Sequence, residues 1–121
     1  MDDRIRFIEH QCKRIMLIDF SGSTPGQILG IVAEVQEQIA EQPRDSVLTL
    51  ADFTDARVDK TVAIRIKEAL VFDRPYVKRS AWVGTEQLPK VLYENFKSFS
   101  QRDFPAFKTR EDAMDWLVEE E

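Results

Sequence analysis

The chain has 121 residues, of which 43% are hydrophobic and 32% charged, and its net charge is −5 at pH 7. This composition excludes an intrinsically disordered chain, and the length is typical of one globular domain covering residues 1–121. No apolar stretch approaches the roughly 18 residues that span a bilayer, so we expect no membrane insertion. The acidic balance argues against nucleic acid and anionic membranes as general partners.

Cys12 is the only cysteine and His10 the only histidine. One cysteine cannot form an internal disulfide, and the pair cannot supply the four ligands of a structural zinc site. Both lie between two predicted strands, so we interpret them as turn residues rather than as a nucleophile pair. The first ten residues have no apolar secretory core, and we therefore expect a cytoplasmic protein.

Two strands open the predicted fold. Residues 5–9 alternate between apolar and polar side chains, which is typical of a strand. Residues 14–20 are more continuously apolar, as in a strand covered on both faces. Because few residues separate the two segments, we expect an antiparallel hairpin.

A helix is predicted after the hairpin. Thr24 is a suitable N-cap, Pro25 fits the first helical position and Gln27 completes a capping box, while Pro43 ends the helix. One apolar stripe follows the helical period: Ile28, Ile31, Val32, Val35 and Ile39.

Strands and helices then alternate. Residues 46–52 predict a buried strand, residues 59–74 a helix that Asp59 can cap, and residues 78–84 the next strand. The helix at 59–74 has four residues on its expected buried face: Val62, Ile66, Ala69 and Leu70.

The last elements are a helix, a short strand and a helix. The first begins near Pro89, and its apolar residues recur at helical spacing: Leu88, Leu92, Phe96 and Phe99. Residues 104–108 predict an edge strand, since proline suits an edge, and residues 109–120 predict the closing helix. Thr109 and Asp112 have capping-box spacing, and three residues pack inward: Ala113, Trp116 and Leu117.

The order β-β-α-β-α-β-α-β-α predicts an α/β fold with a mainly parallel five-stranded sheet and an antiparallel first strand. The aromatic residues fall on strands or apolar stripes, so we expect them in the core: Phe7, Phe20, Trp82, Phe96, Phe99 and Trp116. In such a sheet, the carboxyl ends of the parallel strands share one edge, where ligands usually bind. We call this edge the rim.

Three polar, hydroxyl-rich segments are expected at the rim: 19–24, 52–59 and 84–87. Helix N-termini follow them and offer N–H groups suited to an anion. Turns and helix caps also require such residue types, so a purely structural explanation stays open. The candidate ligand-binding residues are Asp19, Ser21, Asp52, Thr54, Asp55 and Thr85.

Asp19 and Asp52 end neighbouring predicted strands, and two close carboxylates repel unless a proton or a cation lies between them. Arg57, Lys60 or a divalent ion are candidate counter-charges. The chain contains no glycine-rich phosphate loop, nucleophile elbow or metal-binding histidine pair. We therefore assign no catalytic residue, cofactor or resident metal.

The whole chain resembles the SpoIIAA-like branch of the STAS superfamily. The resemblance rests on the hairpin IRFIEHQCKRIMLIDFSG, the strands VLTLADFTDARVD and VKRSAWVG, and the ending FPAFKTREDAMDWL. It implies a SpoIIAA-like fold, related in its sheet to the CRAL-TRIO lipid carriers, which have more chain around their pocket. Anti-sigma-factor antagonists of that superfamily carry a phosphorylatable serine at the helix that follows the central strand. The matching segment here is VDKT, 58–61, so the resemblance leaves Thr61 as the possible phosphoacceptor.

Residues 57–79 form a basic segment in an acidic chain, with seven basic and three acidic residues. Lys60, Lys67 and Arg74 are spaced by seven and form one stripe, which is either a solvated helix face or an interface. An interface of this kind suits an acidic partner or a second copy, and the acidic tail VEEE, 118–121, is complementary to it.

Three functions are carried forward. The first is a non-enzymatic STAS-like regulatory or ligand-binding module that acts through the rim and the helix at 59–74, by protein contact or by binding a small anion or amphipath. The second is a carrier of a small anionic or amphipathic, lipid-like ligand, held at helix N-termini beside Ser21, Thr54 and Thr85. The third is a metal-assisted phosphoryl-transfer enzyme that uses Asp19 and Asp52.

Overall fold

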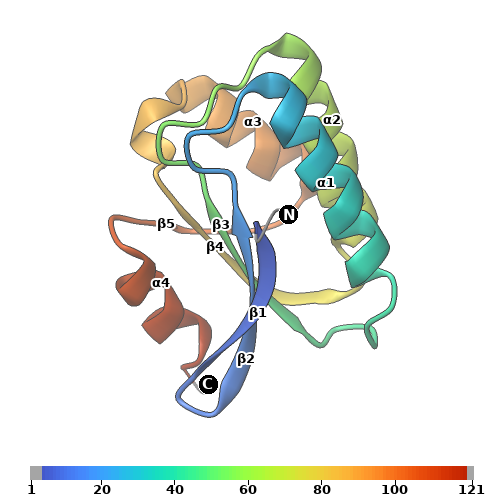
Figure 1. Cartoon of the computed structure of the whole chain (residues 1–121), viewed down its shortest axis with the longest axis vertical. Helices are drawn as coiled ribbons and strands as arrows, with labels where there is room; N and C mark the ends of the chain where they lie inside the picture. Colours follow the sequence, from blue (N-terminus) through green and yellow to red (C-terminus); the bar gives the residue numbers. More distant parts are fainter. Residues whose placement is uncertain (1–3, 120–121) are drawn as a thin grey trace.

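The structure is a computed structural model that describes residues 4–119. It contains a five-stranded sheet in the order β1-β2-β3-β4-β5 (Figure 1). The strands are β1 (Ile5–His10), β2 (Lys13–Asp19), β3 (Val47–Asp52), β4 (Val77–Val83) and β5 (Ala106–Phe107). The helices are α1 (Pro25–Ile39), α2 (Lys60–Asp73), α3 (Lys90–Ser100) and α4 (Arg110–Leu117), with a 3-10 turn at Thr85–Gln87. Within residues 4–119, β1 alone pairs antiparallel with its neighbour, so the predicted fold class is confirmed.

Local signals explain where the elements begin. The hairpin turn uses Gln11 and Cys12, whose φ angles of 50° and 68° suit the twist of the two strands. Thr24 accepts a hydrogen bond from the N–H of Gln27, whose side chain accepts one from the N–H of Thr24, so the capping box is present. The caps of the second and fourth helices also agree with the sequence: Asp59 for α2 and Thr109 for α4.

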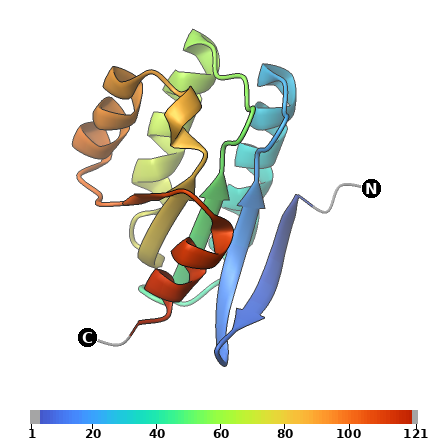
Figure 2. The same ribbon diagram turned by 90° about the vertical axis from the view of Figure 1, so that its left-hand side faces the viewer.

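The helices cover the two faces of the sheet unequally. Helices α1, α2 and α3 lie on one face and α4 on the other (Figures 1 and 2). The side chains of neighbouring residues in β2 point to opposite faces of the sheet, because side chains alternate along a strand. Met16 and Ile18 join the larger core under the three helices, whereas Ile15 and Leu17 join the smaller core under α4. This double burial explains the continuous apolar run of the second strand.

One predicted core residue is wrong: Phe99 is 56% exposed. Helix α3 packs beside α2 at the end of its layer, and its buried residues are Phe96 and Ser100. Phe99 lies off this narrow stripe, and the Nζ atom of Lys67 lies 5.6 Å from its ring centroid. Helical spacing alone did not reveal how little of α3 faces the sheet.

The last strand is shorter than predicted. Pro105 has no N–H to donate, although its carbonyl accepts from the N–H of Trp82, and Phe104 is fully buried. Within residues 4–119, no helix combines the length and the apolar character needed to cross a membrane.

Candidate functional site

The rim brings together three loops that are distant in sequence. Asp19 and Asp52 are direct neighbours at the ends of β2 and β3. The N–H of Gly22 donates to the carbonyl of Thr54 at 2.9 Å, which joins the first two loops. The third loop lies against them, because a Cβ atom added to Gly84 would lie 2.4 Å from the backbone nitrogen of Thr54.

The first two loops contain the same local motif. In Asp19-Phe20-Ser21, the Oδ1 atom of Asp19 accepts from the N–H of Ser21 at 2.9 Å and from its hydroxyl at 2.5 Å. Asp52 accepts in the same way from the N–H and hydroxyl of Thr54, at 2.9 and 2.7 Å. The central phenylalanines stack with their centroids 4.8 Å apart. Each aspartate is therefore first a turn former, as its sequence position suggests.

Arg110, the first residue of α4, lies between the two carboxylates. Its Nε donates to Oδ2 of Asp52 at 2.7 Å, and its Nη2 lies 3.3 Å from Oδ1 of Asp19. The expected counter-charges were Arg57, Lys60 or a divalent ion, whereas the structure places Arg110 in this role. We call the unit of Asp19, Asp52 and Arg110 the rim latch, because it fastens α4 to the ends of two strands.

The electrostatics of the latch stabilise the charged forms of Asp19 and Arg110. Burial by itself raises the pKa of Asp19, but the hydrogen bonds from Ser21 and the positive charges of Arg110 and Arg4 lower it below the ordinary value. Burial lowers the pKa of Arg110, but its contacts with Asp52 and Asp19 raise it above the ordinary value. The lowered pKa keeps Asp19 ionised at neutral pH.

The other predicted site residues lie outside the latch. Asp55 is exposed, with a φ of 58°, and Thr85 begins the 3-10 turn. Thr61 is the exposed second residue of α2. Among residues 4–119, no three His, Cys, Asp or Glu side chains are grouped so that they could hold a metal ion.

A second polar cluster lies inside the larger core. The hydroxyls of Thr49 and Ser80 are 2.6 Å apart. Arg102 donates through Nη2 to Ser80 at 2.5 Å and through Nη1 to the carbonyl of Leu70 at 3.1 Å. These groups and Asp73 line a cavity of about 50 Å³ between the sheet and the helices.

The cavity changes the acidity of its two charged residues. Burial raises the pKa of Asp73 to about 6, although the charges of Arg102 and Arg65 oppose this shift. Burial lowers the pKa of Arg102 to about 10, with Asp73 acting in the opposite direction. Low polarity around both groups makes their charged forms costly.

Sequence reasoning missed Arg110, Asp73 and Arg102. Arg110 begins the helix after the last parallel strand, so topology alone could have placed it at the rim. Asp73 continues the buried stripe of α2 at three residues beyond Leu70, a signal that was available in the sequence. Arg102 follows α3 in a loop, and we find no sequence signal that places it in the core.

Comparisons with known proteins identify the fold. No protein-family model matches the chain, and no curated protein matches it. Among solved structures, the chain is similar to an uncharacterised protein of the DUF3478 family from Shewanella loihica PV-4, described as having a SpoIIAA-like fold. The TM-score is 0.74 at 19% sequence identity, over 94% of this chain and 92% of the other. The chain has a SpoIIAA-like fold.

Within this SpoIIAA-like fold, the segment VDKT (58–61) leads into α2, as the resemblance implied. Asp59 is the N-cap, and its side chain accepts from the N–H of Val62 at 2.8 Å. Thr61 is exposed at the beginning of the helix, whereas the rim latch lies at the other end of the intervening loop.

Proposed function

We propose that the chain is a cytoplasmic, non-enzymatic, STAS-like binding module that docks an acidic protein segment on α2 and the adjoining part of α3. The observation that carries the proposal is an exposed apolar surface next to a basic stripe. We call it the α2–α3 surface, and it consists of Ile64, Val71 and Phe99 with Lys60, Lys67 and Arg74.

The apolar part of the surface leaves about half of each of three large side chains exposed. Ile64 and Val71 are two helical turns apart on one side of α2, and they are 53% and 47% exposed. Phe99 from α3 is 56% exposed, and the Nζ atom of Lys67 lies over its ring. Single exposed apolar residues are common, but neighbouring ones rimmed by charge favour an interaction site.

The charge of the surface selects the kind of partner. Lys60, Lys67 and Arg74 follow the side of α2 that faces α3, and Arg74 reaches Gln101 beyond α3 at 3.4 Å. An acidic amphipathic helix would meet both the stripe and the apolar side chains. The net charge of −5 disfavours binding to an anionic membrane, because a membrane surface would interact with more of the molecule than this stripe.

The rim contacts support a binding module over an enzyme. Arg110 occupies the position between Asp19 and Asp52 where the phosphoryl-transfer hypothesis needs a metal ion. The N–H groups of Ser21 and Thr54, which could hold an anion, donate instead to the two carboxylates. These contacts give the rim a structural role.

Thr61 is the candidate for regulation of this surface. It is exposed in the first turn of α2, where a phosphate would be favoured by the helix dipole and would add negative charge beside Lys60. Incubation with kinases of a cell extract, followed by peptide mass spectrometry, tests whether Thr61 is modified. An unmodified Thr61 in a folded, accessible protein would remove this part of the proposal.

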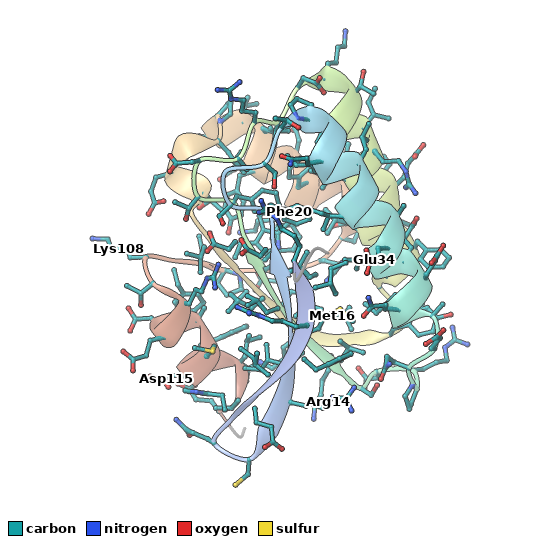
Figure 3. The ribbon with its side chains drawn as sticks, viewed as in Figure 1. Arg14, Met16, Phe20, Glu34, Lys108 and Asp115 are labelled. Atoms are coloured by element: carbon teal, nitrogen blue, oxygen red, sulfur yellow. The ribbon has the colours of Figure 1, made fainter. Side chains whose placement is uncertain are left out.

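The docking test compares charge reversals on two sides of the molecule. Tagged wild-type protein is used to purify a partner, whose acidic segment is synthesised for binding measurements with the wild type, Lys67→Glu, Val71→Asp and Lys108→Glu. Lys108, labelled in Figure 3, lies on the side that carries α4, so it provides a matched control. We expect about tenfold weaker binding for the two α2 variants and little change for the control.

Three results would contradict the proposal. The first is equal binding by all variants. The second is a homodimer in light scattering that Lys67→Glu abolishes, which would assign the surface to a second copy. The acidic tail at 118–121, which was predicted to contact a second copy, includes residues 120 and 121, and these lie outside the described residues. The third is co-sedimentation with phosphatidylserine vesicles that depends on Lys67, which would assign the surface to a membrane.

A further inference from the structure

We propose that the cavity in the larger core binds a small molecule with a neutral head that both donates and accepts hydrogen bonds, such as a primary alcohol or primary amide, and a short apolar tail. This site is separate from the α2–α3 surface and does not depend on its function. Phe20 and Phe53 of the rim segments line this cavity, but its polar groups come from Thr49, Asp73, Ser80 and Arg102, outside the rim where the sequence led us to expect a ligand.

The shape of the cavity sets the size of its occupant. Its apolar wall comes from β2, α1, β3 and α2 and includes Ile18, Val32, Val35, Ala51 and Ile66. Figure 3 shows Phe20, another lining residue, in the region between the sheet and α1. A volume of about 50 Å³ accommodates roughly three to five water-sized groups. The occupant is therefore a short molecule with a few non-hydrogen atoms.

Asp73 supplies the acceptor at the polar end. It is 7% exposed, and its buried Oδ1 atom has no hydrogen-bond partner among the described residues. It is also the last residue of α2, where the helix dipole disfavours a negative charge. A carboxylate that is buried and unpaired in this position is costly, and an occupant with a donor would remove part of that cost.

Two hydroxyls that line the same cavity supply a donor. Thr49 and Ser80 share one hydroxyl hydrogen between them, and Ser80 also accepts from Arg102. One hydroxyl hydrogen of this pair is consequently left to donate elsewhere. The head that matches these groups donates to Asp73 and accepts from a hydroxyl.

This pattern discriminates between classes of ligand. A carboxylate would be repelled by Asp73, and an alkylammonium ion has no acceptor for the hydroxyl and would face Arg102. A hydrocarbon would leave both polar groups unpaired. Alcohols and primary amides satisfy both, and a cluster of water molecules is the competing occupant.

Methyl-selective NMR with two probes of equal size tests the proposal. n-Butanol has a hydroxyl donor, whereas methyl propyl ether has the same number of non-hydrogen atoms and no donor. We expect saturable shifts confined to methyl groups that line the cavity, among them those of Ile18, Val32, Val35 and Ile66. The alcohol should bind about tenfold more tightly than the ether.

Two variants test whether Asp73 causes the preference for the alcohol over the ether. In Asp73→Leu the acceptor is lost, so the two probes should bind alike, whereas Asp115→Leu on the exposed side of α4 should keep the preference for the alcohol. The proposal is overturned if no saturable shift occurs at probe concentrations that leave the protein folded, which would mean water only. Equal affinity of alcohol and ether for the wild type would overturn it as well, whether or not Asp73→Leu folds.

Discussion

Asp73 provides the sharpest test of the electrostatics of the core. Its carboxyl is 7% exposed, one of its oxygen atoms has no hydrogen-bond partner within residues 4–119, and it ends a helix whose dipole opposes a negative charge. Replacing it by asparagine keeps the shape of the side chain and removes the ionisation. We therefore expect Asp73→Asn to be more stable than the wild type at neutral pH, although most core substitutions destabilise.

The magnitude follows from the pKa. Burial raises the pKa of Asp73 from 3.8 to about 6. At about 1.4 kcal/mol per pKa unit, ionising this group in the folded protein costs about 3 kcal/mol relative to the unfolded chain. Because the folded pKa is the higher one, the favourable contribution is complete below pH 3.8 and is lost as the pH rises through about 6.

The assay is chemical denaturation of the wild type and Asp73→Asn between pH 4 and pH 7. The difference in the free energy of unfolding should grow by about 2 to 3 kcal/mol in favour of the variant across this range. Asp45→Asn is the control, since Asp45 is exposed and asparagine tolerates its positive φ of 55°. A constant difference across the pH range would refute the assignment of a raised pKa to Asp73.

Three further predictions concern the rim. Arg110→Met should lower the free energy of unfolding by about 2 kcal/mol at pH 7, measured by denaturation. This loss should shrink as the pH falls through the lowered pKa of Asp19. An unchanged free energy of unfolding would contradict the role of the rim latch. Gly84→Ala should lower the free energy of unfolding by about 3 kcal/mol in the same assay, because its φ is +79° and its Cβ would lie 2.4 Å from the nitrogen of Thr54. An unchanged free energy of unfolding would show that the two loops separate easily. Millimolar magnesium should leave the melting temperature unchanged, because Arg110 already lies between Asp19 and Asp52, and a clear stabilisation that Asp52→Asn removes would revive the metal-dependent hypothesis.

The predictions that succeeded depend on neighbouring residues. The N-caps Thr24, Asp59 and Thr109 act within three residues of their own positions, so their geometry can be read from the chain. The alternation of strands and helices then limits the fold to a mainly parallel sheet, and the ends of its strands necessarily share one edge. The closeness of Asp19 and Asp52 follows from that topology.

The features that were missed depend on contacts between distant segments. Arg110 lies 58 positions from Asp52, and Arg102 lies 22 positions from Ser80, so no local pattern links them. Phe99 is exposed because α3 lies at the end of the helix layer. The spacing of apolar residues along α3 does not indicate this position. Asp73 follows the buried stripe of α2, but only the packed core determines that one of its oxygen atoms lacks a partner in the described part of the chain.

The sequence by itself determined the order of the elements, their caps, the antiparallel hairpin and the shared edge of the strands, since backbone hydrogen bonding and side-chain periodicity act over a few residues. Only the tertiary structure decided which cation joins the rim carboxylates, which apolar side chains stay exposed, and that a carboxyl and a guanidinium line a cavity in the core. These outcomes depend on how much water each group loses and on which remote partner replaces it, and both are set only when the helices pack on the sheet.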